Sequence, residues 1–325
     1  MSDIAVIGGG AWGTALASVL ARAGHRPILL MRDPTRASDM NASGENRKYL
    51  PGIKLPPEIH ATALMSEIKS ASNVLVVTPA QTLRDVLIKH SEFIGQETRL
   101  ILCSKGIEQE TGKRVSEIAA ETCPGRPLAI LSGPSFADDV ARGLPTAVTL
   151  AAETLDAAIS LCETLSASHF RLYATDDIAG AELGGALKNV FALAVGMARG
   201  RGLGASAEAA LITRGFAELQ RLARHFGARP ETLTGLSGLG DLILTCSSPQ
   251  SRNFAYGFAV GEGRNLSGMK LAEGVHTAGI AADLARKEGI DAPIMSVVHA
   301  VLSDKLSVDD AIAGLLKRPL KAESM

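Results

Sequence analysis

A lysine stands inside an apolar helical run at Lys188, within the stretch Gly-Gly-Ala-Leu-Lys-Asn of residues 184–189. A buried lysine is rare in a folded protein unless it is paired or functional. Desolvation or a neighbouring cation lowers the pKa of a lysine from about 10.4 toward neutrality, where its amine can exchange a proton. Lys188 is therefore a candidate proton donor for a carbonyl oxygen, and a candidate base for the reverse oxidation of an alcohol.

Residues that could support Lys188 lie at helical spacings. Gly184 and Gly180 precede it by one and two turns on the same stripe, which predicts a hollow for a small molecule beside the lysine. Close helix packing explains the same glycines. Asp241 and Thr245 are four residues apart and can share one helix face, from which Asp241 could orient Lys188. Taken alone, Asp241 is explained as well by a helix-start acid.

Short polar turns follow three apolar runs, at residues 78–80, 104–106 and 132–137. Ligands of open α/β sheets bind outside the carboxyl ends of the strands. Lys105 is the charged residue of these turns, and it could hold a substrate oxygen or phosphate on the same carbonyl as Lys188. An ordinary solvated lysine is the alternative. We expect the third turn to start a helix, with Pro134 near its first turn.

The glycines Gly8, Gly10 and Gly13 fit the pattern G-x-G-x-x-G between an apolar run, 4–7, and a helical run, 11–23. The pattern gains meaning from a strand before it and a helix after it. Gly8 would permit the tight turn, Gly10 the approach of a pyrophosphate, and Gly13 close packing of helix on strand. Free N–H groups at the helix start attract phosphates, so we expect NAD or NADP here.

Two neighbouring residues bear on the choice between these cofactors. An acid about 20 residues past the last glycine usually accepts the ribose 2′-hydroxyl of NAD. Asp33 has that offset, whereas Arg32 could meet the 2′-phosphate of NADP. Either residue could also be plain surface charge, and the preference stays open.

A candidate phosphate site begins a helix at residues Ser251, Arg252 and Asn253. An arginine beside a helix start combines a bidentate phosphate partner with free N–H groups. A surface capping sequence is the alternative.

The elements that must position these residues divide the chain in two. Apolar runs at 4–7, 27–31, 74–77, 100–103, 128–131, 147–150 and 170–172 alternate with helical stretches, which predicts a parallel sheet covered on both faces. After about residue 175 only helical runs follow. We therefore expect an α/β Rossmann-type, dinucleotide-binding domain at 1–175 and an all-α substrate-binding domain at 176–325.

Composition restricts the class of protein. The 325 residues carry 33 basic and 34 acidic side chains, so we expect no general attraction to nucleic acid. The four cysteines form no C-x-x-C pair, and we expect neither a disulfide framework nor a metal site. No apolar run approaches the ~20 residues of a membrane helix, and no signal peptide is evident, so we expect a cytoplasmic protein without membrane insertion.

The motifs, in this order, resemble those of bacterial NAD(P)-dependent glycerol-3-phosphate dehydrogenases over nearly the whole chain. The matching stretches are GGGAWGTALA from Gly8, SKGIE from Ser104, SGPSFA from Ser132, LPTAV from Leu144, LGGALKNV from Leu183, ALITRG from Ala210, GLGDLILTC from Gly238, QSRN from Gln250 and AEGVHTA from Ala272. Each stretch alone is modest evidence, and the ordered set is highly specific.

The resemblance implies hydride transfer between NAD(P)H and dihydroxyacetone phosphate, giving sn-glycerol 3-phosphate for phospholipid synthesis, with Lys188 as the general base. It implies a homodimer, with the substrate held between the two domains. The family's other substrate residues are matched by Lys105, Gly133, Ser135, Asp241, Arg252 and Asn253, with Thr245 nearby. Its cofactor residues are matched by Ala11, Trp12, Arg32, Lys105, Ala137, Arg252 and Glu273.

Two other classes of protein share parts of the pattern. A β-hydroxyacid or ketopantoate-type reductase also combines a Rossmann domain with a helical domain and a catalytic lysine, but would need a carboxylate clamp. A redox-sensing regulator would keep the glycine turn but would need neither Lys188 nor Asp241.

Overall fold

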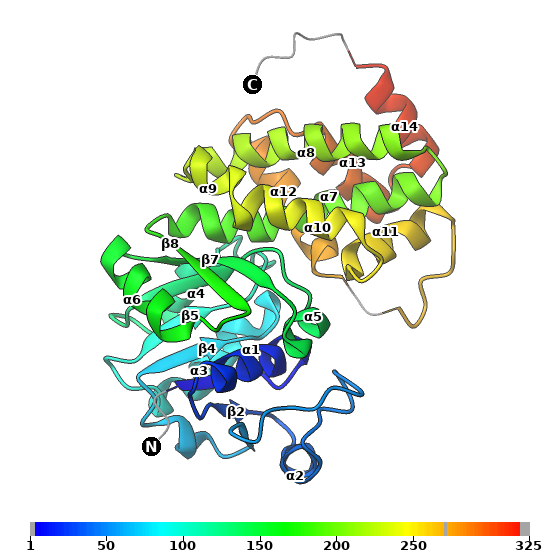
Figure 1. The fold of residues 1–325 in the computed structure, drawn as a ribbon. Coiled ribbons are helices and arrows are strands. Elements are labelled where there is room, and N and C mark those ends of the chain that lie inside the picture. Colours follow the sequence, from blue (N-terminus) through cyan, green and yellow to red (C-terminus); the bar gives the residue numbers. More distant parts are fainter. Residues whose placement is uncertain (1–3, 270–271, 319–325) are drawn as a thin grey trace.

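The computed structural model describes residues 4–269 and 272–318, and Figure 1 shows a sheet domain joined to a helical domain. The ends of the two expected domains, residues 1–3 and 319–325, lie outside the described residues. The division into an α/β part followed by helices is confirmed. The last strand ends at Thr175, and the first long helix of the second part begins at Ile178.

One eight-stranded sheet forms the first part, in the order β3-β2-β1-β4-β5-β6-β7-β8. The strands are β1 (Ile4–Ile7), β2 (Ile28–Leu30), β3 (His60–Thr62), β4 (Asn73–Val76), β5 (Arg99–Leu102), β6 (Leu128–Ser132), β7 (Thr146–Ala152) and β8 (Phe170–Thr175). The expectation of a wholly parallel sheet is wrong at one pair, because β7 runs antiparallel to β6. A fully buried strand has the same apolar pattern in either direction, so the sequence does not reveal its polarity.

Helices cover both faces of the sheet, as expected. They are α1 (Ala11–Arg22), α2 (Pro34–Ser43), α3 (Leu83–His90), α4 (Val115–Thr122), α5 (Ala137–Arg142) and α6 (Leu155–Leu165). Alternate residues of β1 belong to the two hydrophobic clusters on opposite faces of the sheet. Ile4 and Val6 share a cluster with residues of α1, α2, α5 and α6. Ala5 and Ile7 share the other cluster with residues of α3 and α4. This two-residue period fixes which helices lie on which face.

The second part consists of helices. They are α7 (Ile178–Gly200), α8 (Ala205–His225), α9 (Pro230–Thr234), α10 (Asp241–Ser247), α11 (Arg252–Gly261), α12 (Glu273–Lys287), α13 (Pro293–Leu302) and α14 (Val308–Leu316), with a π-helical turn at Leu236–Gly240. No strand occurs among the described residues after Thr175.

Helix α7 is the central element of this part. It is long and apolar enough to cross a membrane, but 83% of its most apolar window is buried inside the protein, so it is a core helix. Its glycines allow α11 to approach to backbone contact: a Cβ on Gly196 would lie 2.3 Å from the carbonyl oxygen of Phe254. Reciprocally, a Cβ on Gly257 of α11 would lie 2.2 Å from the carbonyl oxygen of Leu193. The two helices therefore hold a fixed separation.

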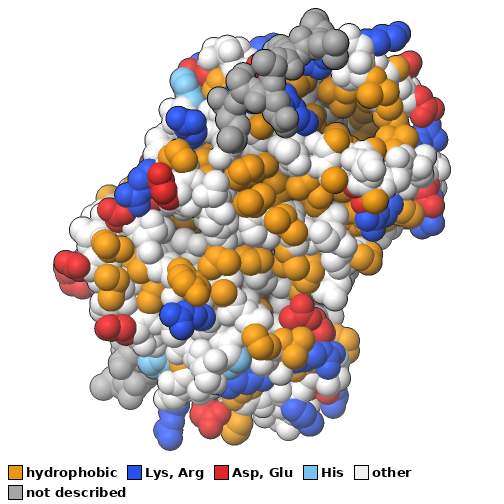
Figure 2. All heavy atoms as spheres, turned by 45° about the horizontal axis from the view of Figure 1, so that its top comes forward, with side chains coloured by type: hydrophobic (Ala, Val, Ile, Leu, Met, Phe, Trp, Pro, Cys, Tyr) orange, Lys and Arg blue, Asp and Glu red, His pale blue; other side chains and the backbone are white. Residues whose placement is uncertain are grey.

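The surface carries charge of both signs. On the face shown in Figure 2, Lys and Arg side chains are interspersed with Asp and Glu side chains. This face offers no broad basic area of the kind that binds a phosphate backbone.

Candidate active site

The side chain of Lys188 projects from the middle of α7 onto the start of α10. Its Nζ donates to Asp241 Oδ1 at 2.5 Å and to Thr245 Oγ1 at 2.6 Å. Asp241 and Thr245 occupy one face of α10, as their spacing predicted. An ammonium has three N–H groups, so one is left for a substrate.

Burial determines the proton affinity of this amine. The Lys188 side chain is 8% exposed, and its desolvation lowers the pKa to about 8. The Asp241 carboxylate opposes this shift, and the positive charge of Lys105 adds to it. A pKa of about 8 allows the amine to give and take a proton near neutral pH, as a general acid–base group must.

Lys105 reaches the same carboxylate from the sheet domain. It follows β5, and its Nζ donates to Asp241 Oδ2 at 2.7 Å and to the carbonyl oxygen of Gly133 at 3.0 Å. Asp241 itself is 1% exposed. The two lysines thus lie on either side of the Asp241 carboxylate, and their convergence on one substrate carbonyl stays a prediction.

The hollow predicted beside Lys188 is not formed by the expected glycines. A Cβ on Gly184 would lie 2.7 Å from the carbonyl oxygen of Ser237, and one on Gly180 would lie 2.2 Å from Asp177 Oδ2. Both glycines therefore serve close packing, which was the alternative explanation. Gly185 faces the site instead, because a Cβ there would lie 3.6 Å from the Lys105 stem.

The loop after β6 brings further candidates to the same edge. Gly133 has φ of 149° and packs on Val148, where a Cβ would come within 2.9 Å of the backbone. Ser135 donates its hydroxyl to the carbonyl oxygen of Gly133 at 3.2 Å. This turn starts a helix, as expected, but α5 begins only at Ala137, three residues after Pro134, because the chain is still extended at residue 136.

The start of α11 lies beside α7 and α12. Ser251 caps α11, its hydroxyl accepting from the amide of Phe254 at 3.2 Å. Asn253 donates to Asn189 Oδ1 at 2.8 Å and accepts from the amide of Gly274 at 2.8 Å. Sequence reasoning did not single out Asn189, although a polar neighbour of Lys188 in an apolar helix was a visible signal.

Arg252, which is exposed, and Glu273, which is partly buried, lie at the edge of this region. The Arg252 side chain is 60% exposed and its Nη2 lies 3.9 Å from Glu273 Oε1. Burial raises the pKa of Glu273, against the opposing effects of Arg252 and the two lysines. The site therefore gathers three cations, Lys105, Lys188 and Arg252, around two carboxylates, and its net charge favours an anionic ligand.

The glycine turn has the geometry that a pyrophosphate needs. Gly8 has φ of 121°, and a Cβ there would lie 2.3 Å from the carbonyl oxygen of Val77. A Cβ on Gly13 would lie 1.9 Å from the carbonyl oxygen of Gly8, so α1 packs directly on the turn. Gly10 caps α1 without a side-chain bond and faces open space. The free amides at this helix start fit a dinucleotide phosphate.

Some polar groups around the turn already have hydrogen-bond partners, and others have none among the described residues. Trp12 follows Ala11 in α1, and its buried Nε1 is without a hydrogen-bond partner among the described residues. Asp33 caps α2, its Oδ1 accepting from the amides of Thr35 and Arg36. Arg32 is exposed. Asp33 therefore has a structural role beside any contact with a ribose, and the choice between NAD and NADP is not decided by these two positions.

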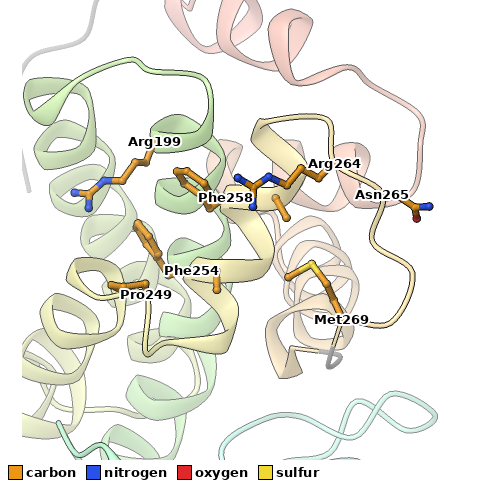
Figure 3. Close-up of a pocket in the computed structure, with 9 residues that line it drawn as sticks. Arg199, Pro249, Phe254, Phe258, Arg264, Asn265 and Met269 are labelled. Carbon is orange, nitrogen blue, oxygen red and sulfur yellow. The ribbon is translucent and has the colours of Figure 1, made fainter.

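A pocket of about 580 Å³ that neither lysine lines lies between Arg199 at the end of α7, helix α11 and the segment that follows it, which includes Arg264 and Met269 (Figure 3). Its apolar wall includes Phe254 and Phe258, and Arg199 and Arg264 stack over these rings. Both arginines are already paired, with Glu208 and Glu262 respectively. No group of side chains able to hold a metal ion occurs among the described residues.

Comparisons with known proteins identify the family of the chain. Models of the N-terminal and C-terminal parts of NAD-dependent glycerol-3-phosphate dehydrogenase match residues 3–158 and 177–313. The chain is 53% identical over 322 residues to glycerol-3-phosphate dehydrogenase (NAD(P)+) of Mesorhizobium japonicum, covering 99% of this chain and 94% of that one. It is 54% identical to the enzyme of the same name from Brucella canis, with 99% of each chain covered.

A solved structure is similar over the same extent. The crystal structure of glycerol-3-phosphate dehydrogenase from Coxiella burnetii has a TM-score of 0.91 and 38% identity, covering 98% of this chain and 99% of that chain. Both domains, their order and the whole length thus match one family. The chain belongs to the NAD-dependent glycerol-3-phosphate dehydrogenases.

Proposed function

We propose that this protein catalyses reversible hydride transfer between NADH or NADPH and dihydroxyacetone phosphate, giving sn-glycerol 3-phosphate for phospholipid synthesis. The observation that carries the chemistry is the buried amine of Lys188, bonded to Asp241 and Thr245, with its pKa lowered to about 8. Family membership supplies the substrate and the cofactor class.

In this proposal each residue of the site has a distinct role in the reaction. A nicotinamide cofactor, when bound, would supply the hydride for the carbonyl carbon. The Lys188 ammonium gives a proton to the carbonyl oxygen, and the resulting neutral amine regains one from solvent. Asp241 orients Lys188 and Lys105 from its two carboxylate oxygens. Lys105 places a second positive charge where the oxygen becomes negative. In the oxidation, the neutral amine of Lys188 takes the hydroxyl proton.

The substrate phosphate fits the start of α11. Arg252 is exposed there and can form a bidentate contact, and the first amides of the helix are donors for an anion. Ser251 shapes the helix start by capping it, and Asn253 fixes its position against α7 through Asn189. Gly133 and Ser135 line the edge opposite, at the end of β6.

The cofactor belongs on the sheet domain in this proposal. Gly8, Gly10 and Gly13 form the phosphate turn, Ala11 and Trp12 open α1, and Ala137 opens α5. Arg32 and Asp33 would lie beside the adenosine ribose, and Lys105, Arg252 and Glu273 would lie toward the nicotinamide. Residues 1–175 then form the dinucleotide-binding domain, and residues 176–325 form the substrate-binding domain.

We also propose a cytoplasmic location and a homodimer, for which the family resemblance is the support. Light scattering on the purified protein tests the oligomeric state, and a monomer at micromolar concentration would contradict it.

The first experiment compares the wild type with Lys188→Ala, using dihydroxyacetone phosphate and either NADH or NADPH. We expect turnover in the wild type and its loss in the variant, with cofactor binding retained. The two wild-type rates establish the preferred cofactor. A wild type that binds cofactor without turnover would contradict the proposed substrate, and 3-hydroxyacids would then be tested.

A further inference from the structure

The loop that carries Lys105 runs from the sheet into the helical domain. Ile107, two residues after Lys105, is 1% exposed and belongs to the core of the helical domain. Gln81 donates to its carbonyl oxygen at 2.7 Å, and a β-bridge pairs Ile107 with Arg114. The loop therefore connects Lys105 rigidly to Arg114, which caps α4.

A buried carboxylate of α7 holds the far end of this loop. Glu182 Oε1 accepts from the amide of Ser116 at 2.8 Å, and its Oε2 accepts from the Ser116 hydroxyl at 2.8 Å. Arg114 Nη1 lies 3.9 Å from Oε2. Glu182 is 4% exposed, and its burial raises the pKa of the carboxyl group. A negative group at the start of α4 is also favoured by the helix dipole.

The position of this contact in the chain links the two lysines. Glu182 stands six residues before Lys188 on one continuous helix, and Ser116 ends the segment that begins at Lys105. Asp241 contacts both lysines directly. The carboxylate of Glu182 adds a second contact between helix α7, which carries Lys188, and the segment that begins at Lys105. A hydrophobic residue would fill the same space without desolvating a charge, so packing alone does not explain a glutamate here.

We infer that Glu182 is a positioning residue for the reaction: by holding the start of α4 against α7, it sets where Lys105 lies relative to Lys188 and Asp241. Glu182 touches neither substrate nor cofactor and acts through Lys105. The inference rests on the roles proposed above for the two lysines. A displacement of about 1 Å at a reacting group can lower a rate about a hundredfold, so a small relaxation at α4 is enough to be measured.

The test compares Glu182→Ala with Glu117→Ala in the complete protein. Glu117 also bonds at the start of α4, to the amide of Arg114 at 2.8 Å, but it is 45% exposed and does not reach α7. We expect Glu182→Ala to lower kcat/KM for dihydroxyacetone phosphate about tenfold to a hundredfold. The NADH dissociation constant should change much less, because the glycine turn supplies the contacts to the cofactor phosphates in this proposal. Glu117→Ala should change neither quantity more than about twofold.

A double-mutant cycle separates positioning from general destabilisation. If Glu182 acts through Lys105, Glu182→Ala lowers kcat/KM much less in a Lys105→Met background than in the wild type. Equal effects in both backgrounds, or an unchanged kcat/KM in a folded Glu182→Ala variant, would overturn the inference. If Lys105→Met itself keeps wild-type activity, the role proposed for Lys105 is wrong instead.

Milder variants cover the case in which Glu182→Ala does not fold. Glu182→Gln keeps one accepting oxygen, and Ser116→Ala removes one of the two donors. Both should lower kcat/KM in the same direction as Glu182→Ala and by a smaller factor. If both variants are folded and retain wild-type kcat/KM, the inference is also overturned.

Discussion

The shared carboxylate of Asp241 leads to opposite pH shifts for two substitutions. Its negative charge raises the pKa of Lys188, whereas the positive charge of Lys105 lowers it. Asp241→Asn therefore lowers the pKa of Lys188 further, and Lys105→Met raises it. The reduction needs the Lys188 ammonium, so its kcat/KM in the wild type falls as the pH rises through about 8.

The size of the first shift follows from the contact. Lys188 donates to Asp241 Oδ1 at 2.5 Å, and a hydrogen bond between charged groups is worth about 1.5 to 3 kcal/mol. One pKa unit corresponds to about 1.36 kcal/mol. In Asp241→Asn, the descending limb of the pH profile, where kcat/KM for the reduction falls with rising pH, should therefore move down by about 1 to 2 units, to about pH 6 to 7. In Lys105→Met the limb should move above 8 instead.

The assay measures kcat/KM for dihydroxyacetone phosphate from about pH 5 to about pH 10, because this quantity reports ionisations of the free enzyme. Oxidation of glycerol 3-phosphate needs the neutral amine, so its kcat/KM should rise through the same pH in each variant. Lower maximal rates are expected in both variants and do not affect the position of the limb. Shifts of the same sign in the two variants would refute the electrostatic assignment of Lys188.

Three further predictions concern the packing of the site and the stability of the fold. In Gly185→Ala the new Cβ would lie 2.5 Å from Ser132 Oγ, so kcat/KM should fall about tenfold or more. Adding Ser132→Ala should restore most of the lost kcat/KM, and a double variant without recovery would contradict this contact. Gly257→Ala should destabilise the protein by about 3 kcal/mol in urea unfolding, whereas Gly314→Ala, which meets nothing within 4 Å, should be neutral or stabilising. Burial raises the pKa of Glu218 to about 7, so between about pH 4.5 and about pH 7 the folded state binds a proton that the unfolded state has lost. The free energy of unfolding should therefore fall as the pH rises through this range. Glu218→Gln should remove this pH dependence, and an unchanged dependence would contradict the assignment.

Local sequence patterns were sufficient for part of the site. Asp241 and Thr245 share a face because four residues make about one helical turn, and a lysine in an apolar helix requires a partner. The G-x-G-x-x-G turn was also predictable, because its three glycines lie in one short segment and each has a known steric role in this pattern. These features depend on residues close together in the chain.

The remaining features depend on contacts between distant segments. Asn253 meets Asn189 across 64 positions, and Glu182 meets Ser116 across 66, so no local spacing indicates either pair. Gly184 shows a second limit. An absent side chain permits either a hollow or close packing, and only the position of the facing segment decides between them. Here the π-helical turn before Asp241 occupies the space.

The active geometry and the interface between the domains are built from the same contacts. Lys105 and Gly133 come from the sheet domain, Lys188 and Asp241 come from the helical domain, and the carboxylate of Asp241 joins them. The glycine turn that we propose for the cofactor phosphates lies wholly within the sheet domain. Changes at the interface should therefore reduce turnover far more than cofactor affinity, because the glycine turn supplies the contacts to the cofactor phosphates in this proposal. Changes in the glycine turn should weaken cofactor binding without disturbing the lysines, because Asp241 continues to hold both of them.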